Sequence, residues 1–190
     1  MTAPPLLEAA RELLDYLGTL GRPACLIGGM VVARWGEPRA TRDVDATVLA
    51  DFGDEARLLA ALLQKFPSRD PDPLPRAEIG RLALLTASNG VQIDLSFAAF
   101  PFEREVLDRA STWQIPPDTG VRTCSPEDLI VYKLVAGRPN DLVDISGIVR
   151  RQGRRLDAER VRRWGRVFAE IKEDPDLLRP FEDGLRSIGL

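Results

Sequence analysis

The sequence contains no histidine, and this absence excludes several classes of active site at once. Ser-His-Asp and Cys-His systems need an imidazole base, and most zinc and non-haem iron sites need imidazole ligands. Cysteine is scarce as well, because Cys25 and Cys124 are the only two. Two cysteines are too few for a disulfide framework or a zinc cluster, and their apolar neighbours indicate buried thiols. Any catalytic chemistry must therefore use carboxylates, Lys, Arg, hydroxyls or a hard metal ion.

Long apolar runs are also absent, since no stretch approaches the roughly 20 residues that cross a bilayer. Residues 1–17 combine acidic side chains with an amphipathic pattern, which is not the pattern of a signal peptide. We therefore expect a cytoplasmic protein without a membrane partner. The 190 residues, of which 44% are hydrophobic and 29% charged, suffice for one good core and a small appended subdomain.

The spacing of apolar residues indicates a mixed α/β part followed by a helical part. Helical spacing predicts helices over residues 5–20, 30–36, 54–66 and 101–110. Apolar and β-like runs predict strands over residues 24–29, 43–50, 81–88 and 91–100. Asn89-Gly90 separates the last two strands and indicates a tight hairpin. The proline-rich residues 67–75 are predicted to form a loop, and residues 112–124 an extended segment.

From Ser125 onward every pattern is helical, with Ser125 as the predicted N-cap and Pro126 at the first helical position. We therefore predict an α/β (α+β) fold, in which a mixed sheet is flanked by helices and followed by a helical C-terminal portion. The predicted domains are a core over residues 1–120 and a helical subdomain over residues 121–190.

Three aspartates are the first candidate site residues. Asp43 and Asp45 would share one face of the strand 43–50, with α-carbons about 6.5–7 Å apart. Such a pair can hold a hard cation, and Mg²⁺ prefers oxygen ligands. Asp94 interrupts an apolar strand, where a buried charge needs a partner. If the two strands pair, three carboxylates come together, and their mutual repulsion requires cations.

The residues before these aspartates fit the same chemistry. Gly28 and Gly29 lead from a strand into a helix, so the backbone can approach a ligand closely, and a helix N-terminus favours phosphate. Arg39 and Arg42 flank the aspartates and can neutralise phosphate charge. Two metal ions shared by three carboxylates are a common arrangement for nucleotidyl transfer. An ordinary turn and a surface carboxylate pair would explain each feature separately, but the combination favours a site for a nucleoside triphosphate with Mg²⁺.

The pattern G-G-x(13)-D-V-D with a downstream I-D-L resembles the nucleotidyltransferase superfamily of the polymerase-β type over residues 24–150. The R-x-T-R-D-V-D form is similar to two branches, the AbiEii-type toxins, including MenT-type tRNA nucleotidyltransferases, and the aminoglycoside nucleotidyltransferases. The resemblance implies a nucleotidyltransferase fold, an NTP donor and two Mg²⁺ ions held by Asp43, Asp45 and Asp94. The usual Gly-Ser is replaced by Gly28-Gly29-Met30, so the serine contact to the phosphates is absent.

Lys133 is the only charge within the apolar residues 129–136, so it either extends to solvent or has a function. Asp141 and Asp144 share a helix face and could hold Lys133 or orient an acceptor hydroxyl, although capping and solvation near a helix start would also explain them. The motif P-E-D-L-I-x-x-K-L-x-A-x-R-x-x-D-x-x-D resembles AbiEii-like proteins. It implies that Lys133 and Asp144 are active-site residues, with Arg138 and Asp141 in supporting roles.

The predicted activity is transfer of a nucleotide from an NTP to an acceptor hydroxyl, with release of pyrophosphate. The resemblance and the basic run 150–166 favour RNA as acceptor, at the 3′ end of tRNA. The protein would then be the toxin of a toxin–antitoxin pair, with a cognate antitoxin as partner. A solvated helix face is the other explanation of these arginines. The alternatives are a small-molecule nucleotidyltransferase of the aminoglycoside type and an inactive binding module that retains the fold.

Overall fold

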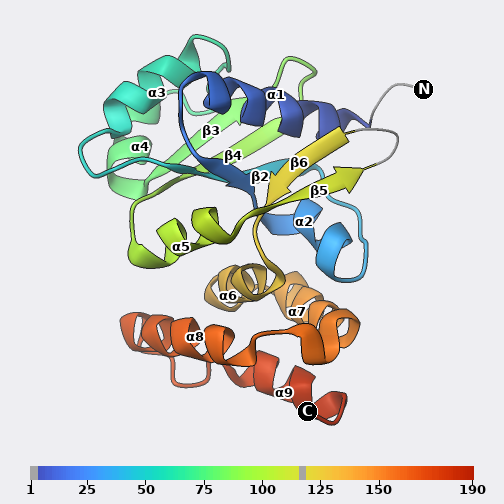
Figure 1. Ribbon diagram of the computed structural model, residues 1–190. Coiled ribbons are helices and arrows are strands. Elements are labelled where there is room, and N and C mark those ends of the chain that lie inside the picture. Colours follow the sequence, from blue (N-terminus) through green and yellow to red (C-terminus); the bar gives the residue numbers. More distant parts are fainter. Residues whose placement is uncertain (1–3, 116–118) are drawn as a thin grey trace. The chain divides into compact units, whose positions relative to one another are not determined.

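The computed structural model describes residues 4–115 and 119–190, and the chain packs as two compact units (Figure 1). Unit 1 comprises residues 1–30 and 40–124, and unit 2 comprises residues 31–39 and 125–190. The predicted α/β architecture, a mixed sheet with helices and a helical C-terminal portion, is confirmed. The division into domains at residues 120 and 121 stays a prediction.

Unit 1 is organised around a mixed sheet with the strand order β3-β4-β2-β1-β6-β5. Its strands within the described residues are β1 (Ala24–Leu26), β2 (Asp43–Leu49), β3 (Leu82–Thr86), β4 (Gln92–Ala98), β5 (Ser111–Ile115) and β6 (Thr119–Thr123). The β3–β4 hairpin is antiparallel, as Asn89-Gly90 predicted. β2 lies between β4, to which it is parallel, and β1, to which it is antiparallel.

The helices of unit 1 are α1 (Pro5–Thr19), α3 (Glu55–Leu63), α4 (Pro73–Gly80) and α5 (Pro101–Arg109). α1 packs on β1, β2 and β6, and α5 packs on β2 (Figure 1). The position of α1 is explained by the apolar stripe of this helix, in which Leu13 and Leu17 are fully buried. The sheet core beneath these helices fixes the strands that carry the aspartates.

In two segments the structure differs from the prediction made from the sequence. The prediction of a loop over residues 67–75 is wrong at its C-terminal end, because α4 begins at Pro73. Proline suits the first turn of a helix, where its missing N–H needs no partner. The extended segment 112–124 contains β5 and β6, which pair antiparallel, and its residues 116–118 lie outside the described residues.

Unit 2 is helical. α2 (Gly28–Trp35) begins in unit 1 and continues into unit 2, which also contains α6 (Pro126–Ala136), α7 (Pro139–Gln152), the 3₁₀ helix η1 (Gly153–Arg155), α8 (Ala158–Lys172) and α9 (Arg179–Ser187). The hydroxyl of Ser125 accepts a hydrogen bond from the Asp128 N–H at 3.1 Å, which confirms the predicted N-cap. α6 packs against α7 and α8, and α7 against α9.

Residues 31–39 pack with α7 rather than with the sheet. Arg151 donates to the Gly36 carbonyl at 2.6 Å, and Gln152 donates to the Trp35 carbonyl at 2.6 Å. Gly36 lies so close to α7 that an added Cβ would be 2.8 Å from Ile148 Cγ1. These contacts hold the end of the segment, and so Arg39, beside α7. Across the described residues, no helix is long and apolar enough to cross a membrane.

Candidate active site

The three aspartates share one face of the pair β2–β4. Side chains alternate along β2, so Val44 is fully buried while Asp43 and Asp45 remain partly exposed. Asp94 is directly opposite Asp45 in the parallel register and is also partly exposed. The strand pairing that would bring Asp94 to the first two carboxylates is therefore present. We call Asp43, Asp45 and Asp94 the acidic cluster.

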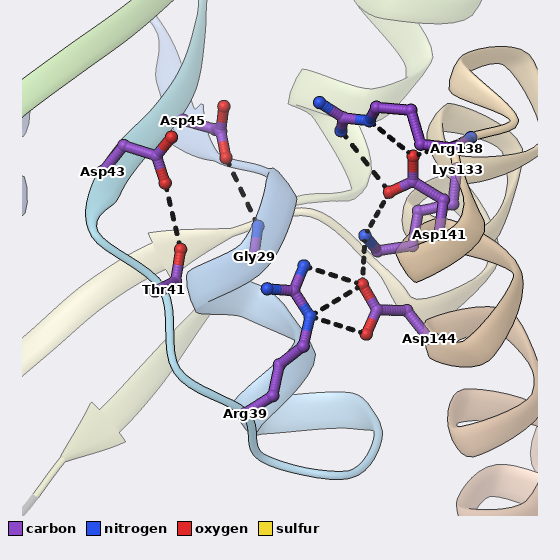
Figure 2. Close-up of polar contacts among 9 residues, drawn as sticks. All are labelled: Gly29, Arg39, Thr41, Asp43, Asp45, Lys133, Arg138, Asp141 and Asp144. Atoms are coloured by element: carbon purple, nitrogen blue, oxygen red, sulfur yellow. Dashed lines mark hydrogen bonds and ion pairs between the residues drawn. The ribbon is translucent and has the colours of Figure 1, made fainter.

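Two members of the acidic cluster accept hydrogen bonds, one from the loop before β2 and one from the start of α2. Asp43 Oδ1 accepts from the Thr41 hydroxyl at 3.0 Å, and Asp45 Oδ2 accepts from the Gly29 N–H at 3.3 Å (Figure 2). An ionised carboxylate offers several acceptor positions on its two oxygens, so one such bond does not exhaust them. These bonds therefore orient the two carboxylates.

Asp94 has a different partner, which the sequence analysis missed. Arg69 donates from Nη2 to Asp94 Oδ1 and to the Ile93 carbonyl, the latter at 3.3 Å. Its Nε donates to the Leu85 carbonyl at 3.1 Å. The guanidinium is therefore fixed at the ends of β3 and β4 and neutralises the third carboxylate. Arg42, in contrast, is exposed and makes no ion pair within residues 4–115 and 119–190.

The donor set of the acidic cluster fits a hard cation. Three carboxylates on one sheet face are oxygen ligands of the kind Mg²⁺ prefers, and the Arg69 guanidinium already occupies the position of a cation at Asp94. With the side chains as they stand, no group of three or more carboxylate, His or Cys side chains in the described part of the chain is gathered as a metal site. The assignment of two Mg²⁺ ions to Asp43, Asp45 and Asp94 thus stays a prediction.

The glycine pair has a structural role in placing Asp45. Gly28 has φ +67°, in the left-handed region that favours glycine. A Cβ added there would lie 2.0 Å from Asp45 Oδ2, so only glycine lets the carboxylate occupy its place. Gly29 follows at the start of α2 and directs its N–H to the same carboxylate. Gly28-Gly29 therefore positions Asp45.

We expect Gly28→Ala to reduce nucleotidyl transfer about 100-fold or more, because a displacement of about 1 Å in a reacting group can cost that much. Gly53→Ala is the matched control, since Gly53 also has a positive φ, +88°, but an added Cβ would meet nothing within 4 Å. Both variants should lose about 1–2 kcal/mol of stability from the left-handed backbone, and Gly28→Ala should lose more because Asp45 must also shift. Equal activity of the two variants would contradict the role of Gly28 in placing Asp45.

A second group of charges lies in unit 2 around Lys133. The side chain of Lys133 is buried, with 4% exposure, so it does not extend to solvent. Its Nζ contacts Asp141 Oδ1 at 2.9 Å and Asp144 Oδ2 at 2.7 Å (Figure 2). Arg39 donates to both oxygens of Asp144, and Arg138 Nε donates to Asp141 Oδ2 at 2.7 Å. We call these five residues the lysine cluster.

The electrostatics of the lysine cluster favour a bound anion. Burial raises the pKa of Asp144, but hydrogen bonds from Arg39 and Lys133 outweigh this effect, and the pKa is lowered. Burial also raises the pKa of Asp141. Hydrogen bonds from Arg138 and Lys133 outweigh this effect, so the pKa of Asp141 is lowered as well. Both carboxylates are therefore ionised at neutral pH. Three cations face two carboxylates, which leaves one net positive charge.

A cavity of about 400 Å³ adjoins the lysine cluster within unit 2. Its walls carry both charged and apolar side chains. They are formed by Glu37, Pro38, Arg39, Val143, Asp144, Ser146, Gly147 and Arg150. Arg39 and Arg150 place positive charge on this wall, and Val143, which is 70% exposed, provides an apolar surface. No sequence pattern singled out Arg150 for this position.

The predicted site residues thus form two groups, one in each unit. Unit 1 brings together Gly28, Gly29 and the acidic cluster, whereas unit 2 holds the lysine cluster, including Arg39. The acidic cluster offers oxygen ligands of the kind that metal ions bind, and the lysine cluster offers fixed cations of the kind that bind phosphate.

Comparison with solved structures identifies the fold. An antigenic nucleotidyltransferase-like protein from Paracoccidioides brasiliensis matches with a TM-score of 0.53 and 18% identity, over 93% of this chain and 92% of that one. The antibiotic-resistance factor ANT(2'')-Ia matches with a TM-score of 0.53 and 18% identity, over 88% and 92%. Its complex with adenylyl-2''-tobramycin gives a TM-score of 0.51 and 16% identity, over 87% and 98%. The chain therefore has a nucleotidyltransferase fold.

Sequence comparison assigns the chain to a family within this fold. Residues 13–186 match the family described as nucleotidyl transferase AbiEii toxin, type IV toxin–antitoxin system. The chain belongs to this family and is a nucleotidyltransferase, which confirms the resemblance seen in the sequence. No curated protein matches the chain.

Proposed function

We propose that the protein transfers a nucleotide from an NTP to an RNA hydroxyl, at the 3′ end of tRNA, in a reaction that depends on Mg²⁺. It would act in the cytoplasm as a toxin that a cognate antitoxin restrains. The observation that carries the proposal is the acidic cluster, in which Asp45 and Asp94 are in register and Asp43 shares their face. Membership of the AbiEii family supports the nucleotidyl transfer itself.

In the proposed reaction the acceptor oxygen attacks the α-phosphorus of the NTP. The bond from that phosphorus to the bridging oxygen breaks, and pyrophosphate leaves with the electron pair. Asp43 and Asp45 would hold both Mg²⁺ ions, with Asp94 as a ligand of one of them and as acceptor of the hydroxyl proton. When bound, the ions would neutralise phosphate charge and lower the pKa of the attacking hydroxyl.

The lysine cluster would bind the triphosphate. Lys133 is buried and held by Asp141 and Asp144, so its ammonium group is fixed before substrate arrives. Fixed cations stabilise the charge of the leaving pyrophosphate without reorganising during the reaction. Arg39 and Arg138 keep the cluster positive overall, while the exposed Arg42 and the backbone at Gly28-Gly29 are further candidates for phosphate contact.

RNA is the preferred acceptor because positive charge gathers in unit 2. Arg39 and Arg150 line the cavity beside Asp144, and α7 and η1 continue with Arg151, Arg154 and Arg155. Arg150, Arg154 and Arg155 are exposed. An aminoglycoside carries several amines and would instead need an acidic cleft. Phosphate contacts from clustered arginines are the usual basis of RNA affinity.

The test is a transfer assay with the purified full chain, Mg²⁺, each α-labelled NTP in turn, and total tRNA or an aminoglycoside as acceptor. We expect label on tRNA with one preferred NTP. Label on the aminoglycoside alone would contradict the RNA proposal and establish the small-molecule alternative. Absence of both transfer and NTP binding would favour the inactive binding module.

A charge-reversed variant tests the acceptor surface separately. Arg154→Glu/Arg155→Glu should raise the KM for tRNA severalfold, and the slope of RNA affinity against salt should fall by about one for each phosphate that is no longer neutralised. The affinity for NTP should not change. Arg179→Glu/Arg186→Glu is the control, because these arginines are exposed in α9 and pair only weakly at the surface. The same effect from both variants would indicate a general charge effect instead of an RNA surface.

A further inference from the structure

Arg69 is fixed by the backbone of the two strands beside it. Its own N–H donates to the Leu84 carbonyl at 2.9 Å, and its Nε donates to the Leu85 carbonyl at 3.1 Å. Nη2 reaches across to the Ile93 carbonyl at 3.3 Å. A side chain restrained at this many points loses little further freedom when it forms an ion pair. The guanidinium is therefore built into the sheet edge, and it is not a mobile surface cation.

This fixed guanidinium contacts the carboxylate that the proposed function assigns to metal binding. Nη2 of Arg69 donates to Asp94 Oδ1, and the two side chains are 25% and 37% exposed. Asp94 is in register with Asp45, so its negative charge lies next to another carboxylate. The Arg69 charge relieves this repulsion in the absence of a metal ion. A divalent cation at Asp94 would meet a positive charge already in place.

We propose that Arg69 is a built-in counter-ion of Asp94 that competes with the divalent cation for this carboxylate. The inference rests on the proposed function, in which Asp94 is a metal ligand. Arg69 holds Asp94 in the absence of a metal ion, and the cation binds Asp94 fully only when the ion pair opens. Because Nε and Nη2 belong to one planar, rigid guanidinium, the pair opens when the Asp94 side chain turns away, while Arg69 stays anchored on the Leu85 and Ile93 carbonyls. Arg69 is thus a positioning residue that sets the affinity for the cation.

The prediction is that Arg69→Gln binds a divalent cation more tightly than the wild type. Removing a competing charge-assisted hydrogen bond should raise the affinity about tenfold. The full-length chain is titrated with Mn²⁺, without NTP, and binding is followed by calorimetry and by the electron paramagnetic resonance of free Mn²⁺. Arg69→Lys keeps the charge but loses the planar fork, so its affinity should lie between the two.

Two controls make the result specific. Arg76→Gln removes a nearby exposed arginine that pairs with Asp70, and it should leave Mn²⁺ affinity unchanged. Arg69→Gln/Asp94→Asn should bind Mn²⁺ no more tightly than Asp94→Asn, since the gain depends on the Asp94 carboxylate. Circular dichroism and thermal melting establish that each variant is folded. If Arg69→Gln does not fold, Arg69→Lys carries the test, with a gain of about threefold expected.

Equal or weaker Mn²⁺ binding by a folded Arg69→Gln overturns the inference, because Arg69 would then support Asp94 as a ligand. In that case the proposed function survives, provided that the wild type binds Mn²⁺. If neither the wild type nor any variant binds Mn²⁺, both the inference and the metal assignment fail. Tighter binding that persists in Arg69→Gln/Asp94→Asn also contradicts competition at Asp94.

Discussion

Asp45→Ala is expected to abolish nucleotidyl transfer, with a loss of about 10³-fold or more, while the melting temperature stays unchanged or rises. Removing one group that stabilises charge in a transition state typically costs 10²–10³-fold, and a shared metal ligand does more than one such task. We expect the fold to tolerate the loss of this carboxylate. It is partly exposed, its bond from the Gly29 N–H is long at 3.3 Å, and it lies opposite Asp94 in the sheet. Its removal relieves repulsion between like charges.

Two further variants make the Asp45 result interpretable. Asp45→Asn keeps the shape and an oxygen that can accept from Gly29, so equal loss of transfer would assign the effect to charge. Asp51→Ala removes a carboxylate of the same unit that is 69% exposed and pairs with Arg104, and it should leave transfer intact. Measurement combines the labelled-NTP assay with thermal melting of each variant. Retained transfer, or a large drop in melting temperature, would indicate a structural role for Asp45.

The acidic cluster shows how far a sequence can predict a site. The shared face of Asp43 and Asp45 follows from the two-residue period of any strand, and the structure has it. The prediction that Asp94 joins Asp43 and Asp45 was conditional, because it required β4 to pair with β2. That pairing is long-range and parallel, so no local signal such as the Asn89-Gly90 turn specifies it.

Arg69 and residues 31–39 show what the sequence could not reveal. Arg69 lies in a proline-rich segment without periodicity, and its partner Asp94 is 25 residues away. Residues 31–39 lie close to the glycine pair in the sequence, but their contacts with α7 join positions more than 100 residues apart. In both cases the contact depends on the tertiary fold, whereas a pattern reports only neighbours along one element. For Lys133 the local signal was useful, because a lone charge in an apolar helix demands a partner.

Lys133→Met is expected to remove both activity and stability, and the two losses can be separated. The buried ammonium contacts Asp141 and Asp144, so its loss leaves two buried carboxylates short of a counter-charge. Breaking one partner of a buried ion pair costs about 3–5 kcal/mol. Transfer should fall at least about 100-fold, because the variant has no fixed cation at this position for the triphosphate. Lys65→Met is the control, since Lys65 is 40% exposed and its contact with Glu12 Oε1 is long, at 3.5 Å.

The pH dependence of stability tests the same contacts. Asp141 and Asp144 have a pKa below the ordinary 3.8 in the folded chain, so their contribution to stability is present above 3.8 and is lost as the pH falls through the lowered pKa. Lys133→Met removes part of that contribution. The difference in melting temperature between wild type and variant should therefore be largest near neutral pH and should shrink below pH 3.8. A difference that does not change with pH would mean that Lys133 stabilises the fold through packing and not through its charge.

Lys133→Met/Asp141→Asn then separates structure from function. Neutralising Asp141 removes one of the uncompensated charges, so part of the lost stability should return, and Arg39 still neutralises Asp144. Transfer should not recover, because the cation that would face the phosphates is still absent. Recovery of both stability and transfer would mean that Lys133 serves only as a structural ion-pair partner. Recovery of stability alone would show that the lysine cluster contributes to transfer beyond stabilising the fold.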